Sequence, residues 1–350
     1  MKSNWIRFLA GVIASAVLVG AFALTGGMKN GKRTDGLLYQ ASGLHPDGEL
    51  LLIDGQTVTA EEYLYWLAQD CDYLAGQVEG LDWDAAVTED MTFGAYAKAD
   101  AMEAVKQHAV VRAWAEEAGI GLTDADKAEM EAQRQQYVTY YGSEESFLQR
   151  LAVMGVSEAA WDMIQTGQYL YRNLYEAFCT PGSGLYPDEA SLADYAAAQG
   201  YMSVYAVTVT DDDAEGVAAD LLARWQAAED KEGEYAAICE ELGQEVGSAV
   251  TLAAVEDDPL SDAIAALEEG GMDAVIDPYE DGTCYVVMRT ETDMSAVAQT
   301  YFDVLWEQRV QDAVVVVNTK LYDTIDTGAF YEKLTQLRAA LEAESGDTAG

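Results

Sequence analysis

Histidine, proline and basic residues are scarce in this chain of 350 residues. It contains 2 histidines, 5 prolines and 19 lysines and arginines, against 62 aspartates and glutamates. His45 and His108 are the only histidines, so a mechanism that needs a histidine pair, or a histidine with a serine or cysteine nucleophile, has almost no residues to draw on. The formal net charge of −43 repels a phosphate backbone, so nucleic acid is excluded as a partner.

The cysteines are few and far apart. Cys71, Cys179, Cys239 and Cys284 form neither a C-x-x-C motif nor a cluster with histidine, which excludes a zinc site of the usual spacing and a thioredoxin-type redox motif. The acidic run at 211–213 fits the positive end of a helix better than a metal site. We therefore predict no metal and no cofactor. A disulfide between two of the four cysteines stays open if the protein is exported.

The N-terminal residues have the pattern of an export signal. Lys2 and Arg7 precede the uncharged residues 8–24, a run at the lower limit for a helix that spans a bilayer. We predict that residues 1–27 direct the chain out of the cytoplasm and remain as a membrane anchor through residues 8–24. The alternative is a secreted protein, cleaved near Ala23.

The rest of the chain divides into regions of different composition. Hydrophobic residues make up 50% of the sequence, enough for packed cores, and the length predicts two or three domains. Glycine, lysine and asparagine in residues 28–49 indicate a flexible linker, and residues 180–187 indicate a second one. Between these linkers the pattern is helical. Thr59 with Glu62, and Thr123 with Asp126, each predict a capping box at the start of a helix.

Beyond residue 187, helical and strand patterns alternate. The predicted order is a helix, a strand, two helices, a possible short strand, a helix and a last strand, which is an α+β arrangement. The predicted ranges are 191–199, 201–209, 210–230, 234–242, 259–269 and 284–290. Cys71 falls on an apolar helical stripe before this region and is predicted to be a core residue.

Three segments in order resemble one known family. Residues 53–63, 118–126 and 147–157 resemble successive motifs of exported foldases of the SurA/PrsA type. The resemblance covers 50–345 and implies a helical SurA-like chaperone domain at 50–180. It also implies a small parvulin-like α/β isomerase domain at 190–292, and C-terminal helices at 293–345 that pack back on the chaperone domain.

The isomerase half departs from the family pattern at its two histidines. Residues 201–208 place Ala206 where parvulins carry the first histidine, and residues 283–289 place Tyr285 at the second. Alanine offers no hydrogen bond to the twisted amide of an X–Pro bond, whose isomerisation must cross about 18–20 kcal/mol. We therefore expect peptidyl-prolyl isomerase activity to be weak or lost.

The function that the resemblance implies is that of an extracytoplasmic chaperone for unfolded or partly folded exported proteins. Two alternatives stay open: an active peptidyl-prolyl isomerase with an altered site, and a membrane-anchored interaction scaffold. Tyrosine gives a large contact area at little cost in entropy, so a tyrosine-rich groove is expected to bind clients. The candidate residues are Tyr137, Tyr140, Tyr141, Tyr169, Tyr171 and Tyr175.

Overall fold

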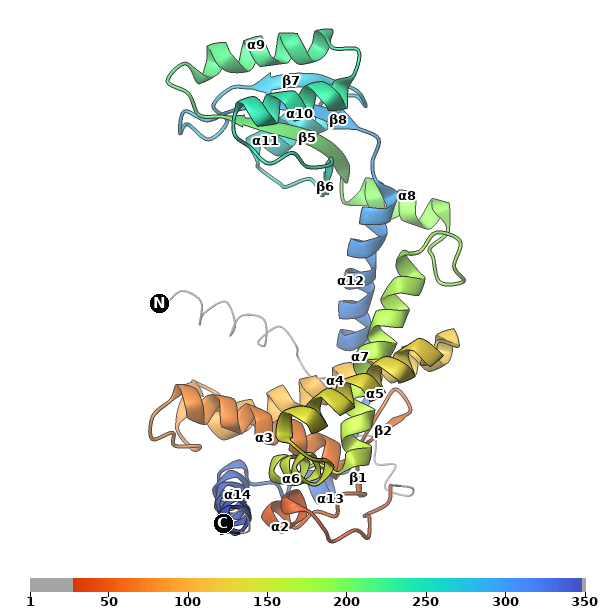
Figure 1. Ribbon diagram of the computed structural model, residues 1–350, viewed down its shortest axis with the longest axis vertical. Coiled ribbons are helices and arrows are strands. Elements are labelled where there is room, and N and C mark those ends of the chain that lie inside the picture. The colour runs from red at the N-terminus through yellow and green to blue at the C-terminus, as the bar shows by residue number, and fades with distance from the viewer. Residues whose placement is uncertain (1–27, 348–350) are drawn as a thin grey trace. The chain divides into compact units, whose positions relative to one another are not determined.

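The computed structural model describes residues 28–347, which form an α+β protein, as the sequence predicts (Figure 1). The chain separates into two compact units: residues up to Leu174 together with those from Trp306 form unit 1, and Tyr175–Leu305 form unit 2. The predicted signal or anchor at 1–27 lies outside the described residues. Within 28–347, no helix combines the length and the apolar character needed to cross a bilayer.

Unit 1 is mainly helical. Its elements are α2 (Leu37–Ser42), β1 (Glu49–Ile53), β2 (Gln56–Thr59), α3 (Ala60–Gln77), β3 (Ala86–Thr88), β4 (Met91–Thr92), α4 (Phe93–Ala118), α5 (Asp124–Tyr141), α6 (Glu144–Met154), β9 (Val315–Val317), α13 (Thr319–Tyr322) and α14 (Thr327–Asp347). Two further helices, α7 (Glu158–Cys179) and α12 (Met294–Asp312), each contain a boundary between the units.

A small antiparallel sheet in the order β2-β1-β9 lies in the core of unit 1. Its middle strand, β1, is apolar, and Leu50, Leu51 and Ile53 are fully buried. Leu51 is paired with Val317 of β9, so residues from near the end of the chain complete a sheet that begins at residue 49. The helix α14 continues this association, because it packs against α2, α4 and α6.

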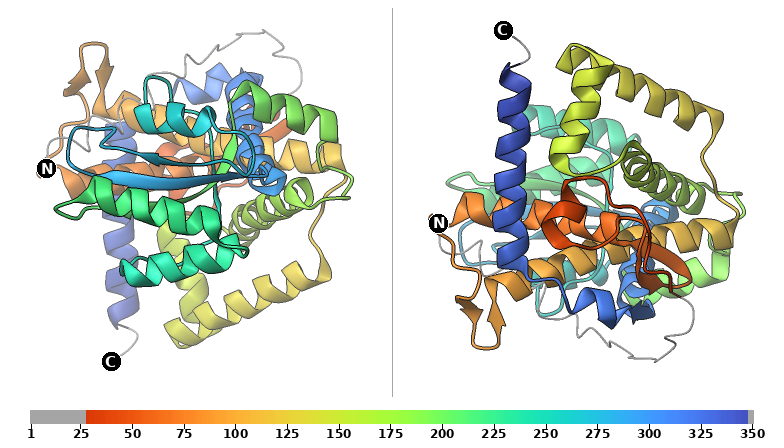
Figure 2. Two further views of the ribbon diagram at one scale, coloured as in Figure 1. Left: turned by 90° about the horizontal axis from the view of Figure 1, so that it is seen from above. Right: turned by 90° about the horizontal axis from the view of Figure 1, so that it is seen from below.

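The stretch predicted as a flexible linker contains the helix α2 (Figure 2). Leu37, Leu38 and Leu44 are buried in the core of unit 1. Residues 28–49 therefore contribute to packing in this structure, unlike the solvated linker that their glycines and lysines suggest. Three leucines among many polar residues are too few to produce a helical period in the sequence, but they are enough to anchor one short helix.

The two capping predictions have different outcomes. Thr123 and Asp126 form the predicted reciprocal box at the start of α5. At the start of α3, the Thr59 hydroxyl accepts a hydrogen bond from the Glu62 backbone N–H, but the Glu62 carboxylate is bonded to Arg112, at 2.8 Å from its Nη1. The Glu62 carboxylate thus forms an ion pair with a distant helix in place of the predicted hydrogen bond to the Thr59 backbone N–H.

Unit 2 is a four-stranded antiparallel sheet with helices on both faces. Its elements are α8 (Glu189–Ala198), β5 (Met202–Val209), α9 (Ala214–Ala227), α10 (Lys231–Glu241), β6 (Val250–Leu252), α11 (Pro259–Ala265), β7 (Met272–Val275) and β8 (Cys284–Thr290). The strand order is β6-β5-β8-β7. The predicted helices and the strands at 201–209 and 284–290 are present with small shifts, and β7 is a strand that the sequence analysis did not predict.

The sheet of unit 2 packs on two separate clusters. Val207, Val209, Cys284 and Val286 point toward α9 and α10, where Trp225 is fully buried. On the opposite face, Met202 and Val204 of β5 and Val287 of β8 form a second cluster with Ile264 of α11. This alternation follows from the period of two along a strand.

All four cysteines are free thiols. Cys71, Cys239 and Cys284 are buried, and Cys179 is partly buried. The prediction of Cys71 as a core residue is confirmed, because it belongs to the core of unit 1. Burial raises the pKa of the Cys71 thiol well above its usual range, so this thiol stays protonated and unreactive.

Candidate functional site

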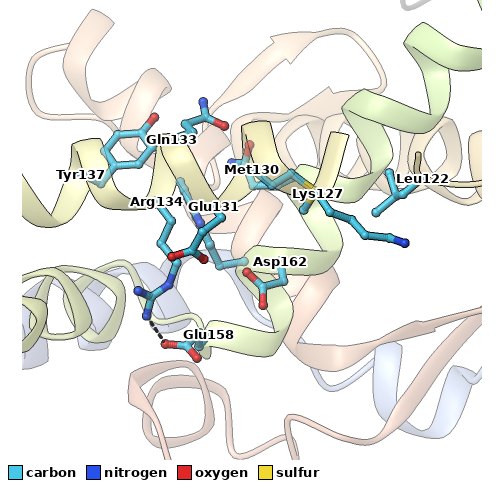
Figure 3. Close-up of a pocket in the computed structure, with 11 residues that line it drawn as sticks. Leu122, Lys127, Met130, Glu131, Gln133, Arg134, Tyr137, Glu158 and Asp162 are labelled. Atoms are coloured by element: carbon cyan, nitrogen blue, oxygen red, sulfur yellow. Dashed lines mark hydrogen bonds and ion pairs between the residues drawn. The ribbon is translucent and has the colours of Figure 1, made fainter. Parts of the chain in front are cut away.

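A groove of about 470 Å³ lies between α5 and α7 in unit 1 (Figure 3). Aromatic, aliphatic, amide and charged side chains all contribute to its lining. The lining residues are Leu122, Lys127, Met130, Glu131, Gln133, Arg134, Tyr137, Glu158, Trp161, Asp162 and Gln165. On α5 they recur at helical spacing, as they do on α7, so each helix turns one face toward the groove.

One end of the groove is fixed by Asp126 near the start of α5. Its carboxylate accepts hydrogen bonds from Arg172 Nη2 at 2.6 Å and from Asn173 Nδ2 at 2.8 Å, both on α7. It also accepts a bond from the Thr123 backbone N–H at 2.7 Å. These donors, with Asn173 and Thr123 contributing most, hold the pKa of Asp126 well below its usual range. The capping box therefore starts α5 and also ties it to α7.

The other end is fixed by Arg134 near the C-terminal half of α5. Arg134 Nη1 donates to Glu144 Oε2 at 3.0 Å, at the start of α6, and Nη2 donates to Glu158 Oε2 at 2.9 Å, at the start of α7 (Figure 3). The Arg134 guanidinium also lies 5.3 Å from the centroid of the Phe147 ring. One arginine thus joins α5 to both following helices and uses its charge within the protein.

Aromatic rings and one amide form the less polar part of the groove. Tyr137 and Trp161 meet edge to face, with centroids 5.7 Å apart, and Tyr137 stacks on the buried Phe147 at 6.3 Å. The side-chain oxygen of Gln165 is buried and has no hydrogen-bond partner among the described residues. A buried acceptor without a donor is unfavourable by about 1–3 kcal/mol, so it favours a guest that brings an N–H group.

The charge of the groove is acidic once its ion pairs are counted. Arg134 is bound to Glu158, and Lys127 pairs with Asp124 at 3.3 Å. Glu131 and Asp162 then remain without a cationic partner in the described part of the chain. Partial burial, together with the nearby Glu158 carboxylate, raises the pKa of Asp162. A positively charged group in the groove would be attracted by both carboxylates.

The structure separates the six tyrosines predicted to bind clients. Tyr137 lines the groove. Tyr140, which is 81% exposed, and Tyr141 form an edge-to-face pair with centroids 5.0 Å apart at the end of α5. Tyr169 is buried, with Arg172 4.7 Å above its ring.

The last two tyrosines are on the second half of α7. Tyr171 packs against Trp306 at 5.2 Å in unit 1, and Tyr175 packs against Phe302 at 5.2 Å in unit 2. The six therefore do not line one common groove.

The sequence analysis did not identify four of the groove residues, namely Met130, Gln133, Arg134 and Gln165. The feature of the sequence that could have identified them is the spacing of three, four and seven residues that the lining side chains share along each of the two helices.

The second candidate site is the face of the unit 2 sheet that carries Ala206 and Tyr285. Ala206 is exposed and lies opposite Val287, and Tyr285 lies opposite Thr208. Tyr285 meets Tyr279 edge to face at 6.2 Å, and the Tyr279 hydroxyl donates to Asp258 Oδ2 at 2.9 Å. The polar groups in these contacts are thus the tyrosine hydroxyls and the Asp258 carboxylate.

Neither histidine is in unit 2. His45 Nδ1 lies 2.6 Å from the Arg33 carbonyl oxygen, and His108 is tilted against Trp66 with ring centroids 5.1 Å apart. Burial lowers the pKa of His108 to about 4, so its ring is neutral at pH 7. Both residues belong to unit 1. No group of three or more histidine, cysteine, aspartate or glutamate side chains within 28–347 is arranged to hold a metal ion.

Comparison with known proteins gives matches among solved structures. No family model and no curated protein matches the chain. The foldase PrsA from Streptococcus pneumoniae str. Canada MDR_19A is 13% identical, with 73% of this chain and 99% of that chain covered and a TM-score of 0.26. PrsA from Lactococcus lactis is 16% identical, with 82% and 92% covered and a TM-score of 0.28. PrsA from Bacillus subtilis is 14% identical, with 73% and 92% covered and a TM-score of 0.25.

These structures carry the same family name as the resemblance found in the sequence.

Proposed function

We propose that the chain is an extracytoplasmic chaperone of the foldase type, which holds unfolded or partly folded exported polypeptides in the groove between α5 and α7. The observation that carries this proposal is the composition of the groove. Met130, Tyr137, Trp161 and Gln165 all line the same space of about 470 Å³, and the Gln165 side-chain oxygen has no hydrogen-bond partner within residues 28–347.

An unfolded chain supplies what this groove lacks. Its backbone presents N–H groups that can bond to Gln165, and its apolar side chains can pack on Tyr137, Trp161 and Met130. Methionine adapts to differently shaped neighbours, and tyrosine and tryptophan combine a large apolar surface with a polar atom. Such a lining accepts many sequences weakly, which is what a holding chaperone requires.

The sequence supports the same function independently of the groove. Residues 53–63, 118–126 and 147–157 follow the order of the SurA/PrsA motifs, and residues 1–27 carry the pattern of an export signal. The membrane anchor and the extracytoplasmic location are parts of the proposal that depend on residues 1–27. The exposed Tyr140, with Tyr141 beside it, would extend the contact surface beyond the end of the groove.

Filling the groove is expected to abolish most of the protection that the protein gives to an aggregating client. Gln133 is half-buried and lines the groove, whereas Gln136 is exposed on the same helix and does not line it. Gln133→Trp should lower protection about tenfold by occupying the space of a guest side chain, which corresponds to about 1.4 kcal/mol of binding. Gln136→Trp should leave protection unchanged. Light scattering of a reduced client over a range of chaperone concentrations measures both.

Two further comparisons test how clients bind to the groove. A basic client should be protected better than an acidic one at low salt, and the difference should shrink when salt shortens the Debye length to below about 8 Å. The double variant Tyr140→Ala/Tyr141→Ala, with its fold checked by circular dichroism, should weaken protection less than Gln133→Trp. If Gln133→Trp and Gln136→Trp protect equally well, the groove is not the client site. No protection by the unaltered protein would favour the scaffold alternative.

Peptidyl-prolyl isomerase activity is expected to be at least 100-fold below that of an intact parvulin. Ala206 supplies no hydrogen bond, and loss of one positioned donor in a preorganised site lowers a rate by about 10²–10³. A protease-coupled assay on a prolyl tetrapeptide measures this rate. Ala206→His with Tyr285→His should not restore full activity, because no stretch between Gly243 and Pro259 matches the part of the family's proline pocket expected there. A rate within tenfold of an intact parvulin would instead support the isomerase alternative.

A further inference from the structure

A pocket of about 440 Å³ lies within unit 2, whereas the groove between α5 and α7 belongs to unit 1. It is formed by the end of α8, the start of β5, the segment after β6, the end of α11, the end of β8 and the start of α12. Most of its side chains are small or apolar. They are Ala193, Ala196, Ala197, Gly200, Tyr201, Met202, Ala254, Ala265, Arg289, Thr292 and Met294.

The charge of this lining is opposite to that of the unit that contains it. Residues 175–305 hold 29 aspartates and glutamates and 3 basic residues, a net charge of −26. More than one residue in five is therefore acidic, yet none of the 11 lining residues is. The single charged group in the pocket is the guanidinium of Arg289.

Only part of the Arg289 guanidinium forms hydrogen bonds within the protein. Its Nη1 donates to the Ala265 carbonyl at 3.1 Å and to the Leu267 carbonyl at 2.7 Å, which caps the end of α11. No ion pair joins it to any carboxylate in residues 28–347. Arg224 in the same unit differs, because it bonds Glu234 at 2.6 Å and Glu241 at 2.7 Å.

A role as a helix cap explains the hydrogen bonds of Arg289 Nη1, but it gives no role to the other two guanidinium nitrogens. The Nε and Nη2 groups form the other edge of the guanidinium, and they have no partner among the described residues. Two parallel N–H groups on that edge match the two oxygens of a carboxylate. The carbonyls of Ala265 and Leu267 hold the plane of the guanidinium in place, so little side-chain entropy would be lost when the second edge is used.

We propose that this pocket binds the terminal carboxylate of a polypeptide whose last residue is small and apolar, with Arg289 as the carboxylate ligand. The alanines, Gly200 and Met202 form the wall against which the last side chain would pack. The charge of unit 2 favours a polypeptide over a free anion, because a net charge of −26 repels small anions. A polypeptide can carry lysine or arginine upstream of its end and so remain attracted to the surface.

The experiment compares two peptides on the purified full-length protein. One is a fluorescein-labelled peptide of sequence Lys-Lys-Ser-Gly-Val-Ala with a free carboxylate, and the other has the same sequence with a C-terminal amide. Fluorescence anisotropy should give a dissociation constant at least about tenfold lower for the free acid, because a bidentate charge-assisted pair is replaced by a weaker contact. Unlabelled N-acetylalanine should compete at least about 100-fold less well than the unlabelled acid peptide.

Variants separate a pocket effect from a folding effect. Arg289→Gln should bring the acid peptide to the affinity of the amide, and its melting temperature reports any loss of the cap on α11. Ala197→Leu keeps Arg289 and fills the pocket from α8, and it should weaken the acid peptide about tenfold or more. Ala198→Leu is the matched control on the same helix, because Ala198 is exposed and does not line the pocket. It should bind like the unaltered protein.

Several results would overturn the proposal. Equal affinity for the acid and the amide, or no binding of the acid at 1 mM peptide (about −4 kcal/mol), would show that Arg289 serves only as a helix cap. Equal loss in Ala197→Leu and Ala198→Leu would place the peptide elsewhere. Competition by N-acetylalanine as strong as that by the acid peptide would overturn the assignment to polypeptide ends. None of these results bears on the groove in unit 1, which the variants at Gln133 and Gln136 test separately.

Discussion

Replacing Arg112 by methionine is expected to lower the free energy of unfolding by about 3–5 kcal/mol. Glu62 in the first turn of α3 is 1% exposed, and its carboxylate is held by Arg112 of α4 through N–O distances of 2.8 and 3.5 Å. Without the arginine, a buried carboxylate would lack its cation, and the methionine would provide only packing. Urea unfolding monitored by circular dichroism measures the loss.

The same substitution should make stability depend more steeply on pH. Burial raises the pKa of Glu62 above its usual range, although Arg112 opposes this effect. A carboxyl group with a raised folded pKa favours the folded state most below its unfolded pKa, and this contribution falls as the pH rises through the folded pKa. Removing Arg112 raises the folded pKa of Glu62 further. The loss caused by Arg112→Met should therefore be larger at pH 8 than at pH 4.

Two controls accompany this measurement. Lys127→Met removes one member of an exposed ion pair with Asp124, and it should change stability by less than about 1 kcal/mol. Adding Glu62→Gln to Arg112→Met should recover part of the loss and remove the added pH dependence, because no buried charge then remains. A loss below 1 kcal/mol for Arg112→Met that is equal at both pH values would show that Glu62 has access to water.

Replacing Gly155 by alanine is expected to lower the free energy of unfolding by about 2–5 kcal/mol. Gly155 ends α6 with φ of +89°, and a Cβ there would lie 2.8 Å from Leu38 Cγ and 2.9 Å from Leu38 Cδ2. The left-handed backbone accounts for about 1–2 kcal/mol, and overpacking against Leu38 for about 1–3 kcal/mol. Urea unfolding at neutral pH measures the sum.

Gly142→Ala isolates the backbone part of this effect. Gly142 ends α5 with φ of +91°, and a Cβ there would meet nothing within 4 Å. Its loss should be about 1–2 kcal/mol. The difference between the two variants measures how firmly α2 holds Leu38 against the end of α6. Equal losses would mean that Leu38 moves aside freely, and that residues 28–49 behave more like the linker that their composition suggests.

Sequence patterns predicted correctly those features of the fold that depend on neighbouring residues. Thr123 and Asp126 form the predicted capping box, and the helices and the two long strands of unit 2 lie close to their predicted ranges. Such features depend on residues within one turn of a helix or one face of a strand. The three-residue β6 was predicted only as a possible strand and the four-residue β7 was not predicted, because segments this short show no clear period of two.

Features that depend on contacts between residues far apart in the chain could not be predicted from the sequence. Glu62 has the spacing of a capping box but bonds Arg112, fifty residues further along the chain. The groove was missed for a similar reason, because Met130 and Gln165 belong to different helices and neither is unusual by itself. The tyrosines are conspicuous in the sequence, yet Tyr169 is a buried residue. Whether a side chain lines a groove or fills a core is decided by the partner helix, which the sequence alone does not identify.

The pairing of β1 with β9 has a consequence for the order of events during synthesis. Leu51 emerges from the ribosome early, but its neighbour Val317 in the sheet follows 266 residues later. At about 5–20 residues per second, the apolar strand β1 waits roughly 13–50 s with one edge uncovered. Residues 175–305 contain both partners of each of their own strand pairs, so unit 2 can complete its sheet first. During this interval the nascent N-terminal half is itself an incompletely folded polypeptide with an exposed edge, and is exposed to aggregation until its last strand arrives.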